Sequence, residues 1–184
     1  SAVLVSFIWV FIFTNAMPAL GGVLGWDWLA NISWFGTPSM ATVTIIVVSI
    51  WQNIGFLMII YTAGLQTIPK DVMESAELDG CSGLKKVLKI ELPLLMPTVT
   101  INLFVSISGA FKSFDIPNAM TGGGPYGSTM PVAMNIYQEA FTKYNLGYGS
   151  AKSVILFLTV AAVTLIQLYC TRKKEVEYLS LIHI

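Results

Sequence analysis

The stretch MESAELDGCSGLKKVLKIELP, residues 73–93, places a dense group of charges in the middle of an otherwise apolar chain. Together with the three residues before it, this stretch holds nine of the twenty formal charges among the 184 residues. Ahead of residue 70, Asp27 is the only charged residue. Such a concentration of charge predicts one segment exposed to water between segments that avoid water.

The composition indicates a membrane protein rather than a soluble domain. Only 11% of the residues are charged and the mean hydropathy is +0.72, whereas a soluble domain has about 25% charged residues. Lipid must therefore cover much of the surface. The formal net charge of zero and the absence of a basic run with interleaved aromatic residues argue against nucleic-acid binding.

Four apolar stretches predict membrane spans, and each approaches the ~20 residues that cross ~30 Å of hydrocarbon. They are residues 1–20, 40–65, 94–111 and 153–170. A backbone in lipid must satisfy its own polar groups, so each stretch predicts a helix and the fold class is an all-α polytopic membrane protein. We expect a single transmembrane domain over residues 1–178 that lacks its first spans, because Ser1 opens directly into an apolar segment without a leader. Residues 179–184 continue no pattern and are expected to be a non-native tail.

The distribution of basic residues predicts the orientation in the membrane. Seven of the ten Lys and Arg residues lie in the loop at residues 66–93 or directly after the last span. The positive-inside rule places both segments in the cytoplasm, so the loops at residues 21–39 and 117–152 face outward. Trp26, Trp28 and Trp34 in the first external loop are typical of an interfacial aromatic belt. These features predict a multi-pass protein of the cytoplasmic (inner) membrane.

The charged loop is expected to form two short helices. Pro69 suits a first helical turn, and Gly80 suits the left-handed position that ends a helix. Ser82 is expected to cap the second helix and Pro93 to end it. The face expected to be solvated carries three basic residues, Lys85, Lys86 and Lys89. An amphipathic helix pair resting on anionic lipid headgroups explains these features as well as a protein contact does.

The spacing within the loop favours a protein contact. Glu74, Ser75 and Ala76 are followed after three residues by Gly80 and, after nine more, by the sequence IELP at residues 90–93. This pattern resembles the EAA loop of ABC importer permeases, with Ser75 in place of Ala as its one departure. Three further segments, SIWQNIGFLMIIYTAGLQTIPKD, MTGGGP and GYGSAKSVILFLTVAAVTLIQL, resemble the carbohydrate-uptake branch of maltose- and glycerol-phosphate-type permeases. The resemblance covers nearly all of residues 1–178.

This resemblance implies a type I ABC importer permease core (MetI-like) that moves a sugar or sugar derivative across the cytoplasmic membrane and is not itself an enzyme. Its partners would be a second permease subunit, a cytoplasmic ATPase dimer and an extracytoplasmic solute-binding protein. The chain would hold no cofactor, because ATP binds to the ATPase partner. Coupling to that ATPase would involve eight loop residues: Glu74, Ser75, Ala76, Asp79, Gly80, Ile90, Leu92 and Pro93.

Polar residues inside apolar spans mark functional sites by default, because they are costly in lipid. The maltose-type permeases imply solute contacts at seven positions here: Ser49, Gln52, Asn53, Phe56, Ser106, Ala110 and Ser113. A sugar requires hydrogen-bonding groups beside an apolar or aromatic face, and this set supplies both. Hydrogen bonds between helices, without any ligand, are the alternative. Lys112 departs from the family pattern; it would pair with Asp115 on a shared helix and would favour an acidic or phosphorylated solute.

The remaining candidate motifs predict no catalytic or metal chemistry. The TGGGP segment at residues 121–125 lacks the Gly-Lys pair of a phosphate-binding loop, so we expect a tight external turn. Cys81 and Cys170 lie far apart in the chain, and His183 is the only histidine, so no metal site is expected. The alternative function, an ion-coupled secondary transporter, would need carboxylates inside its spans, where Asp115 at a membrane edge is the sole candidate.

Overall fold

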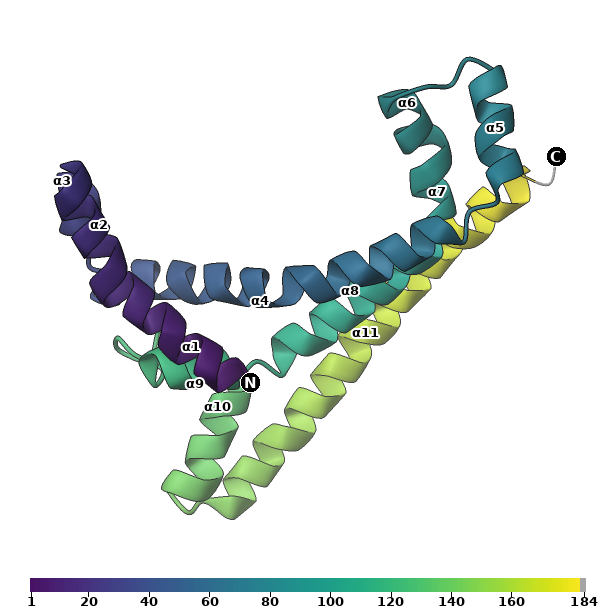
Figure 1. The fold of residues 1–184 in the computed structure, drawn as a ribbon. Helices are drawn as coiled ribbons and strands as arrows, with labels where there is room; N and C mark the ends of the chain where they lie inside the picture. The colour runs from purple at the N-terminus through teal and green to yellow at the C-terminus, as the bar shows by residue number, and fades with distance from the viewer. Residues whose placement is uncertain (183–184) are drawn as a thin grey trace. The chain divides into compact units, whose positions relative to one another are not determined.

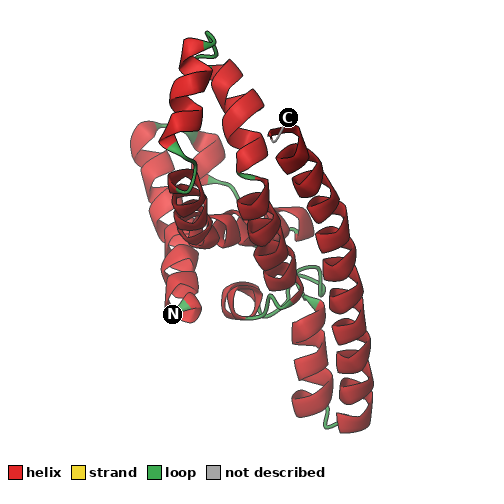
Figure 2. Cartoon of the chain, turned by 90° about the vertical axis from the view of Figure 1, so that its right-hand side faces the viewer, coloured by secondary structure: helices red, strands yellow, loops and turns green. Residues whose placement is uncertain are grey.

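A computed structural model describes the backbone of residues 1–182 and the side chains of residues 1–172, and every regular element in that part is a helix (Figure 1 and Figure 2). The expected non-native tail at residues 179–184 lies outside the described side chains. In chain order, with η for a π-helical turn, the elements are α1 (Ala2–Phe11), η1 (Ile12–Ala16), α2 (Met17–Leu24), α3 (Asp27–Ala30), α4 (Pro38–Gln66), α5 (Lys70–Leu78), α6 (Leu84–Lys86), η2 (Val87–Glu91), α7 (Leu92–Leu94), α8 (Met96–Phe111), α9 (Asp115–Thr121), α10 (Val132–Tyr137), η3 (Gln138–Thr142) and α11 (Leu146–Ile182).

The chain divides into two compact units, and α4 and α11 each contribute to both. Unit 1 consists of Ser1–Asn53 and Phe111–Leu156, and unit 2 consists of Ile54–Ala110 and Phe157–Ile184. The charged loop, the helical segment that leads into it and the helix that follows it therefore all belong to unit 2.

Three helices in the described chain are long and apolar enough to cross a membrane: Ala2–Leu24, Pro38–Gln66 and Leu146–Arg172. These spans correspond to three of the four predicted apolar stretches. The stretch predicted at residues 94–111 is the shorter helix α8, which is bent by 70° from the preceding helix Leu84–Leu94. The described residues thus contain three spans, or four if the bent pair counts as one.

The core of unit 1 consists of Phe13, Ile45, Val48, Ile116 and Met120, which join the first span and α4 to α9. The core extends over aromatic neighbours, with Trp9 stacked on Phe13 at a centroid distance of 5.3 Å and Trp34 against Phe13 at 4.8 Å. Trp34 is therefore partly buried against the core of unit 1, while its predicted place in an interfacial belt stays a prediction.

Glycine allows α3 to fold back onto α2. A Cβ atom added to Gly21 would lie 2.5 Å from the backbone nitrogen of Ala30, a distance that no other residue type tolerates. Gly25 follows α2 in the left-handed region, with φ of 68°, and reverses the chain. Trp26 and Trp28 beside this turn remain exposed, as the predicted interfacial belt requires.

Candidate functional site

The charged loop begins with a helix that ends as predicted. Pro69, in extended conformation, precedes α5, and Asp71 lies in the first turn, where the helix dipole favours negative charge. At the other end Gly80 has φ of 73°, and its N–H donates to the Glu77 carbonyl at 3.0 Å. The left-handed conformation predicted for Gly80 is confirmed. Open space surrounds the position where a Cβ atom would lie, so the backbone conformation is what selects glycine.

The second helix of the loop begins differently from the prediction. Its N-cap is Gly83, with φ of 59° and ψ of −138°, and no side chain caps it. The predicted capping role of Ser82 is therefore wrong, because a second left-handed glycine separates its hydroxyl from the helix. A single-turn helix, α6, then continues through η2 into α7.

Pro93 lies inside this continuous helical segment instead of ending it. It occupies the first turn of α7, directly after the π-helical turn η2, a position where a missing N–H is tolerated. The chain bends two residues later, at Leu95, whose N–H still donates to the Glu91 carbonyl at 2.9 Å. The predicted stop at Pro93 is thus displaced to the sharp bend before α8.

An ion pair joins the two arms of the loop, α5 and α6, whose ribbons are labelled in Figure 1. Lys86 Nζ lies 2.7 Å from Glu77 Oε1; the Lys86 side chain is 16% exposed and the Glu77 side chain 63%. The hydrogen bond and the charge of Lys86 lower the pKa of Glu77 below its ordinary value of 4.5. The prediction that Lys86 is solvated alongside Lys85 and Lys89 is wrong, because Lys86 turns inward to this carboxylate.

The outer surface of the loop differs from the predicted set of coupling residues. Ala76 is buried within the chain, so its side chain is not part of the exposed surface of the loop. Leu78 and Leu84 were missed by the sequence analysis; they flank the turn and are 88% and 78% exposed. The sequence pattern that could have indicated them is a leucine on each side of a turn that contains two glycines. The predicted residues that are exposed beside them are Glu74, Ser75, Asp79, Gly80 and Leu92, whereas Ile90 and Pro93 are half-buried.

The residues predicted to contact solute are divided between the two units. Ser49, Gln52, Asn53 and Ser113 belong to unit 1, and Phe56, Ser106 and Ala110 belong to unit 2. Gln52, Asn53 and Phe56 are exposed, although they lie in an apolar span. Asn53 Nδ2 donates to the Ser49 carbonyl of its own helix at 2.8 Å, which leaves its amide oxygen free to accept. A cavity shared by all seven residues remains a prediction.

Lys112 and Asp115 do not form the predicted pair. Helix α8 ends at Phe111, so Lys112 lies in the turn while Asp115 begins α9. Both residues are exposed, and no ion pair joins them. Because the helix that would have aligned them ends before Lys112, the geometric basis of the prediction is missing.

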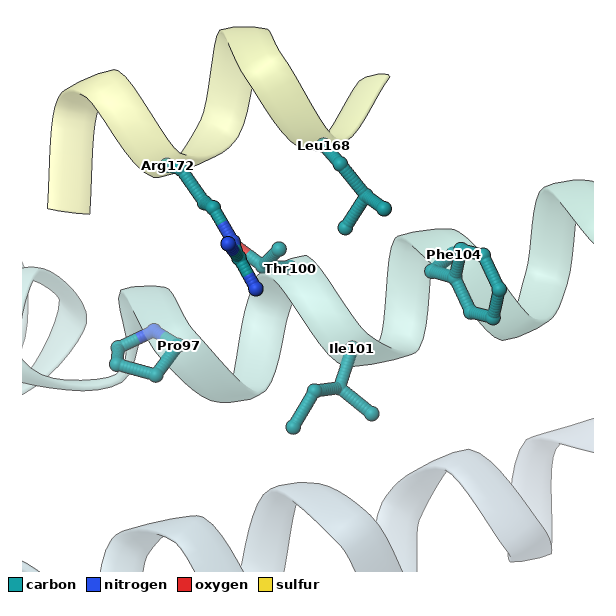
Figure 3. A pocket seen from close by; sticks show the side chains of 6 residues that line it. All are labelled: Pro97, Thr100, Ile101, Phe104, Leu168 and Arg172. Carbon is teal, nitrogen blue, oxygen red and sulfur yellow. The ribbon is translucent and has the colours of Figure 1, made fainter. Parts of the chain in front are cut away.

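A groove in unit 2 lies apart from the predicted solute contacts (Figure 3). It has a volume of about 320 Å³ between α8 and α11, and its lining residues are Pro97, Thr100, Ile101, Phe104, Leu168 and Arg172. The walls are apolar except for the Thr100 hydroxyl and the Arg172 guanidinium. Because none of the predicted solute-contacting residues lines it, this groove is not the predicted solute site.

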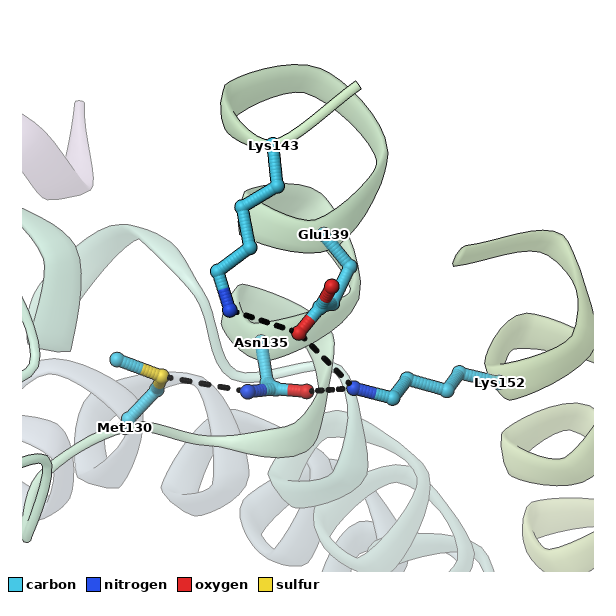
Figure 4. Close-up of polar contacts among 5 residues, drawn as sticks. All are labelled: Met130, Asn135, Glu139, Lys143 and Lys152. Carbon is cyan, nitrogen blue, oxygen red and sulfur yellow. Dashed lines mark hydrogen bonds and ion pairs between the residues drawn. The ribbon is translucent and has the colours of Figure 1, made fainter. Parts of the chain in front are cut away.

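The predicted external segment contains a charged cluster that the sequence analysis missed (Figure 4). Glu139 Oε1 lies 2.9 Å from Lys143 Nζ and 3.5 Å from Lys152 Nζ, and Lys152 also donates to Asn135 Oδ1 at 2.6 Å. The hydrogen bond from Lys143 lowers the pKa of Glu139, although burial acts in the opposite direction. The cluster connects α10 and η3 to the start of α11.

Close packing supports this cluster. A Cβ atom added to Gly149 on α11 would lie 2.8 Å from the Cβ of Ala140 on η3, so the two helices touch at small residues. Lys152 Nζ also lies 4.4 Å from the centroid of the Tyr148 ring. The Glu139–Lys143 spacing of four residues was visible in the sequence, but the approach of Lys152 depends on this tertiary contact.

The TGGGP segment forms a closed turn, as predicted. Gly122 and Gly123 both have positive φ, and the Thr129 hydroxyl donates to the Gly124 carbonyl at 2.6 Å. Thr129 N–H also donates to the Gly123 carbonyl at 3.4 Å. Two consecutive left-handed residues explain why this turn requires glycine.

Comparison with known proteins places this helical arrangement in a family. The family described as "Binding-protein-dependent transport system inner membrane component" matches residues 1–176. The chain is 36% identical to the probable starch degradation products transport system permease protein AmyD of Thermoanaerobacterium thermosulfurigenes, over 95% of the chain and 59% of that protein. It is 39% identical to the sulfoquinovosyl glycerol transport system permease protein SmoG of Agrobacterium fabrum, over 79% of the chain and 47% of that protein. The chain thus spans only part of the length of these relatives.

A solved structure shows the same fold. A chain in the crystal structure of a bacterial ABC transporter involved in the import of the acidic polysaccharide alginate matches with a TM-score of 0.83 at 20% identity. The match covers 94% of this chain and 61% of the other. The predicted all-α fold of an ABC importer permease is confirmed. The chain belongs to the family of binding-protein-dependent transport system inner membrane components and is a multi-pass protein of the inner membrane.

Proposed function

We propose that this chain is part of the permease subunit of an ATP-driven importer for a sugar or sugar derivative. The family membership and the names of the relatives, which are permease proteins of transport systems for starch degradation products and for sulfoquinovosyl glycerol, support this proposal. The complete transporter would contain a second permease subunit, a cytoplasmic ATPase dimer and an extracytoplasmic solute-binding protein. ATP would bind to the ATPase, so the permease itself would need no cofactor.

The charged loop would be the contact with the ATPase, and its exposed tip is the observation that carries this proposal. Leu78 and Leu84 project at the tip, next to the acidic side chains of Glu74 and Asp79. An exposed apolar pair rimmed by charge is typical of a protein contact.

Alternating access would follow from the connection of the loop to the membrane. The loop joins α4 directly to α8, so closure of the ATPase dimer would displace the loop and tilt the attached spans. The tilt would expose the solute site alternately to the two sides of the membrane. The Ala76 packing and the Glu77–Lys86 ion pair would hold the two arms of the loop together during this movement.

The solute would contact the exposed polar groups of α4. Gln52 and Asn53 supply amide groups, and Phe56 supplies an aromatic face one turn away, a combination suited to a sugar ring. Lys112, exposed at the end of α8 and unpaired with Asp115, would favour a solute with an acidic or phosphorylated group. Replacement of Gln52, Asn53 or Ser113 by alanine should lower uptake about fivefold per lost hydrogen bond, while the ATPase activity without solute stays unchanged.

The function is tested with the full-length protein, reconstituted in vesicles with its partner permease, ATPase and solute-binding protein. Uptake of radiolabelled maltose, trehalose and glycerol 3-phosphate is measured with ATP present and absent. We expect uptake of at least one of these solutes that requires both ATP and the binding protein. Uptake that continues without ATP and collapses with a protonophore would instead identify an ion-coupled transporter.

A further inference from the structure

The spans of unit 2 contain a buried amide that bonds to a neighbouring helix. Asn102 on α8 is 3% exposed, and its Nδ2 donates to the Leu57 carbonyl of α4 at 3.4 Å. Its Oδ1 is buried without a partner among the described residues. An apolar side chain of similar size would fill this space without the cost of an unpaired oxygen. Packing alone therefore does not account for an amide at this position.

The same face of α8 touches α4 a second time. Thr98 lies one helical turn before Asn102, and a Cβ atom added to Gly64 of α4 would lie 2.2 Å from the Thr98 hydroxyl oxygen. The two helix backbones therefore approach closely at the end next to the charged loop. Gly64 precedes the end of α4 by two residues, and Thr98 follows the start of α8 by two.

The opposite face of α8 bonds to α11. Gln167 Nε2 donates to the Thr100 carbonyl of α8 and to the Thr171 hydroxyl, both at 3.3 Å. Thr100 and Asn102 are two residues apart, which turns them by about 200° around the helix axis. Side-chain amides thus hold α8 from two sides, toward α4 through Asn102 and toward α11 through Gln167.

We infer that Asn102 and Gln167 are positioning residues that make α8 and its two neighbours move as one body with the charged loop. This inference rests on the proposed role of the loop as the ATPase contact. The loop connects α4 to α8. These helices pack closely at their loop ends, at Gly64 and Thr98, and are hydrogen-bonded farther from the loop through Asn102. Without the amide ties, displacement of the loop would separate the helices instead of tilting them.

The test measures distances between spin labels in the full-length complex, with Cys81 and Cys170 replaced by serine. Labels are placed at three exposed positions, Ile59 on α4, Leu103 on α8 and Leu165 on α11. In the otherwise native protein we expect the Ile59–Leu103 and Leu103–Leu165 distances to be the same in nucleotide-free and vanadate-trapped complexes. In the Asn102→Leu variant the Ile59–Leu103 distance should change on trapping. In the Gln167→Leu variant the Leu103–Leu165 distance should change.

A functional measurement accompanies the distances. ATP hydrolysis without solute-binding protein should rise about threefold in each variant, the factor that corresponds to an interhelical hydrogen bond of ~0.6 kcal/mol. Thr62→Val is the matched control, because the Thr62 hydroxyl bonds only to the Met58 carbonyl of its own helix. Distances and hydrolysis that match the native protein in both leucine variants would overturn the inference.

Binding of the ATPase separates this inference from the proposed function. Both leucine variants should still purify with the ATPase subunit, because the loop surface is unchanged. If a variant retains the ATPase and its label distances do not change on trapping, the role of the amides is contradicted, while the proposed contact between the loop and the ATPase stands. Loss of the ATPase from these variants would show that the amides support the loop fold, and would also overturn their role in transmission.

Discussion

The two helical hairpins of this protein use their charges in opposite ways. In the hairpin from α10 to the start of α11, the Glu139 side chain is 11% exposed and two lysines lie within ion-pair distance of it. In the charged loop, Glu77 has one lysine partner and is 63% exposed, while Glu74, Asp79 and Lys85 are exposed beside it. Glu139 is thus covered by its own hairpin, whereas the carboxylates of the charged loop are exposed and would be available to the proposed partner.

The packing of glycine and alanine sharpens the contrast. In the hairpin from α10 to the start of α11, Gly149 and Ala140 bring the two helices into direct contact beside the ion cluster. In the charged loop, Ala76 is enclosed, but Leu78 and Leu84 project into open surroundings. Exposed ion pairs contribute little to stability, and exposed leucines contribute nothing until a partner covers them. The proposed contact with the ATPase would cover these leucines and so stabilise the loop.

The largest expected effect comes from Gly80→Val. A β-branched residue at φ of 73° is strained by ~1 kcal/mol or more, and the strain distorts the exposed turn. The full-length variant should still insert and bind its partner permease, but it should lose the ATPase on purification and lose transport. Lys85→Ala is the matched control, since Lys85 is exposed and Lys86 is not. Normal transport by Gly80→Val would show that the charged loop is not the contact with the ATPase.

Labelling tests whether the two regions face opposite sides of the membrane. In a protein with Cys81 and Cys170 replaced by serine, a single cysteine is introduced at Ser128 or at Ser82, both of which are exposed. An impermeant thiol reagent applied to intact cells should label the cysteine at position 128 and leave that at position 82 unlabelled until the cells are opened. The reverse pattern would show that the positive-inside assignment is wrong.

Neutral replacement of each glutamate compares the two hairpins directly. Glu139→Gln removes the carboxylate from two lysines in a covered site, so we expect faster amide hydrogen exchange over residues 132–152. Glu77→Gln removes one exposed pair, and exchange over residues 70–94 should change much less. Equal acceleration of hydrogen exchange in both variants would mean that burial of the glutamate does not increase the stability contributed by its ion pairs.

The smallest expected effect is the pH dependence of the loop. The pKa of Glu77 is lowered in the folded protein, so its stabilising contribution is fully present above the ordinary value of 4.5 and is lost as the pH falls through the lower, folded value. Protection of residues 70–94 from hydrogen exchange, measured relative to the intrinsic exchange rate at each pH, should fall in that range, and Lys86→Ala should remove this loss of protection. An unchanged pH profile in Lys86→Ala would show that another group is titrating.

Much of the fold was predictable because lipid imposes simple rules on sequence. The apolar stretches that became α4 and α11 had to be helical, since no water is present to satisfy their backbone. Gly80 was predictable for a local reason, because a left-handed residue commonly ends a helix. Predicting the spans and this turn required no information about which other helices pack against them.

The errors share a different cause. Lys86 was expected in solvent with Lys85, yet it pairs with Glu77 nine residues earlier, across a turn whose path Gly83 sets. Pro93 was expected to end its helix, but the π-helical turn before it shifts the bend to Leu95. Each error concerns a side chain whose partner depends on how the chain turns between two helices.

Composition and short-range spacing were enough to predict the membrane class, the helical spans, the position of the charged loop and its likeness to a permease family. The hydrogen bonds of Asn102 and Gln167 to neighbouring helices, and the approach of Lys152 to Glu139, become visible only in the folded chain. Polar side chains that are distant in sequence form these contacts only when helix packing brings them within about 3.5 Å of each other. Periodicity along one helix contains no information about the rotation of the next.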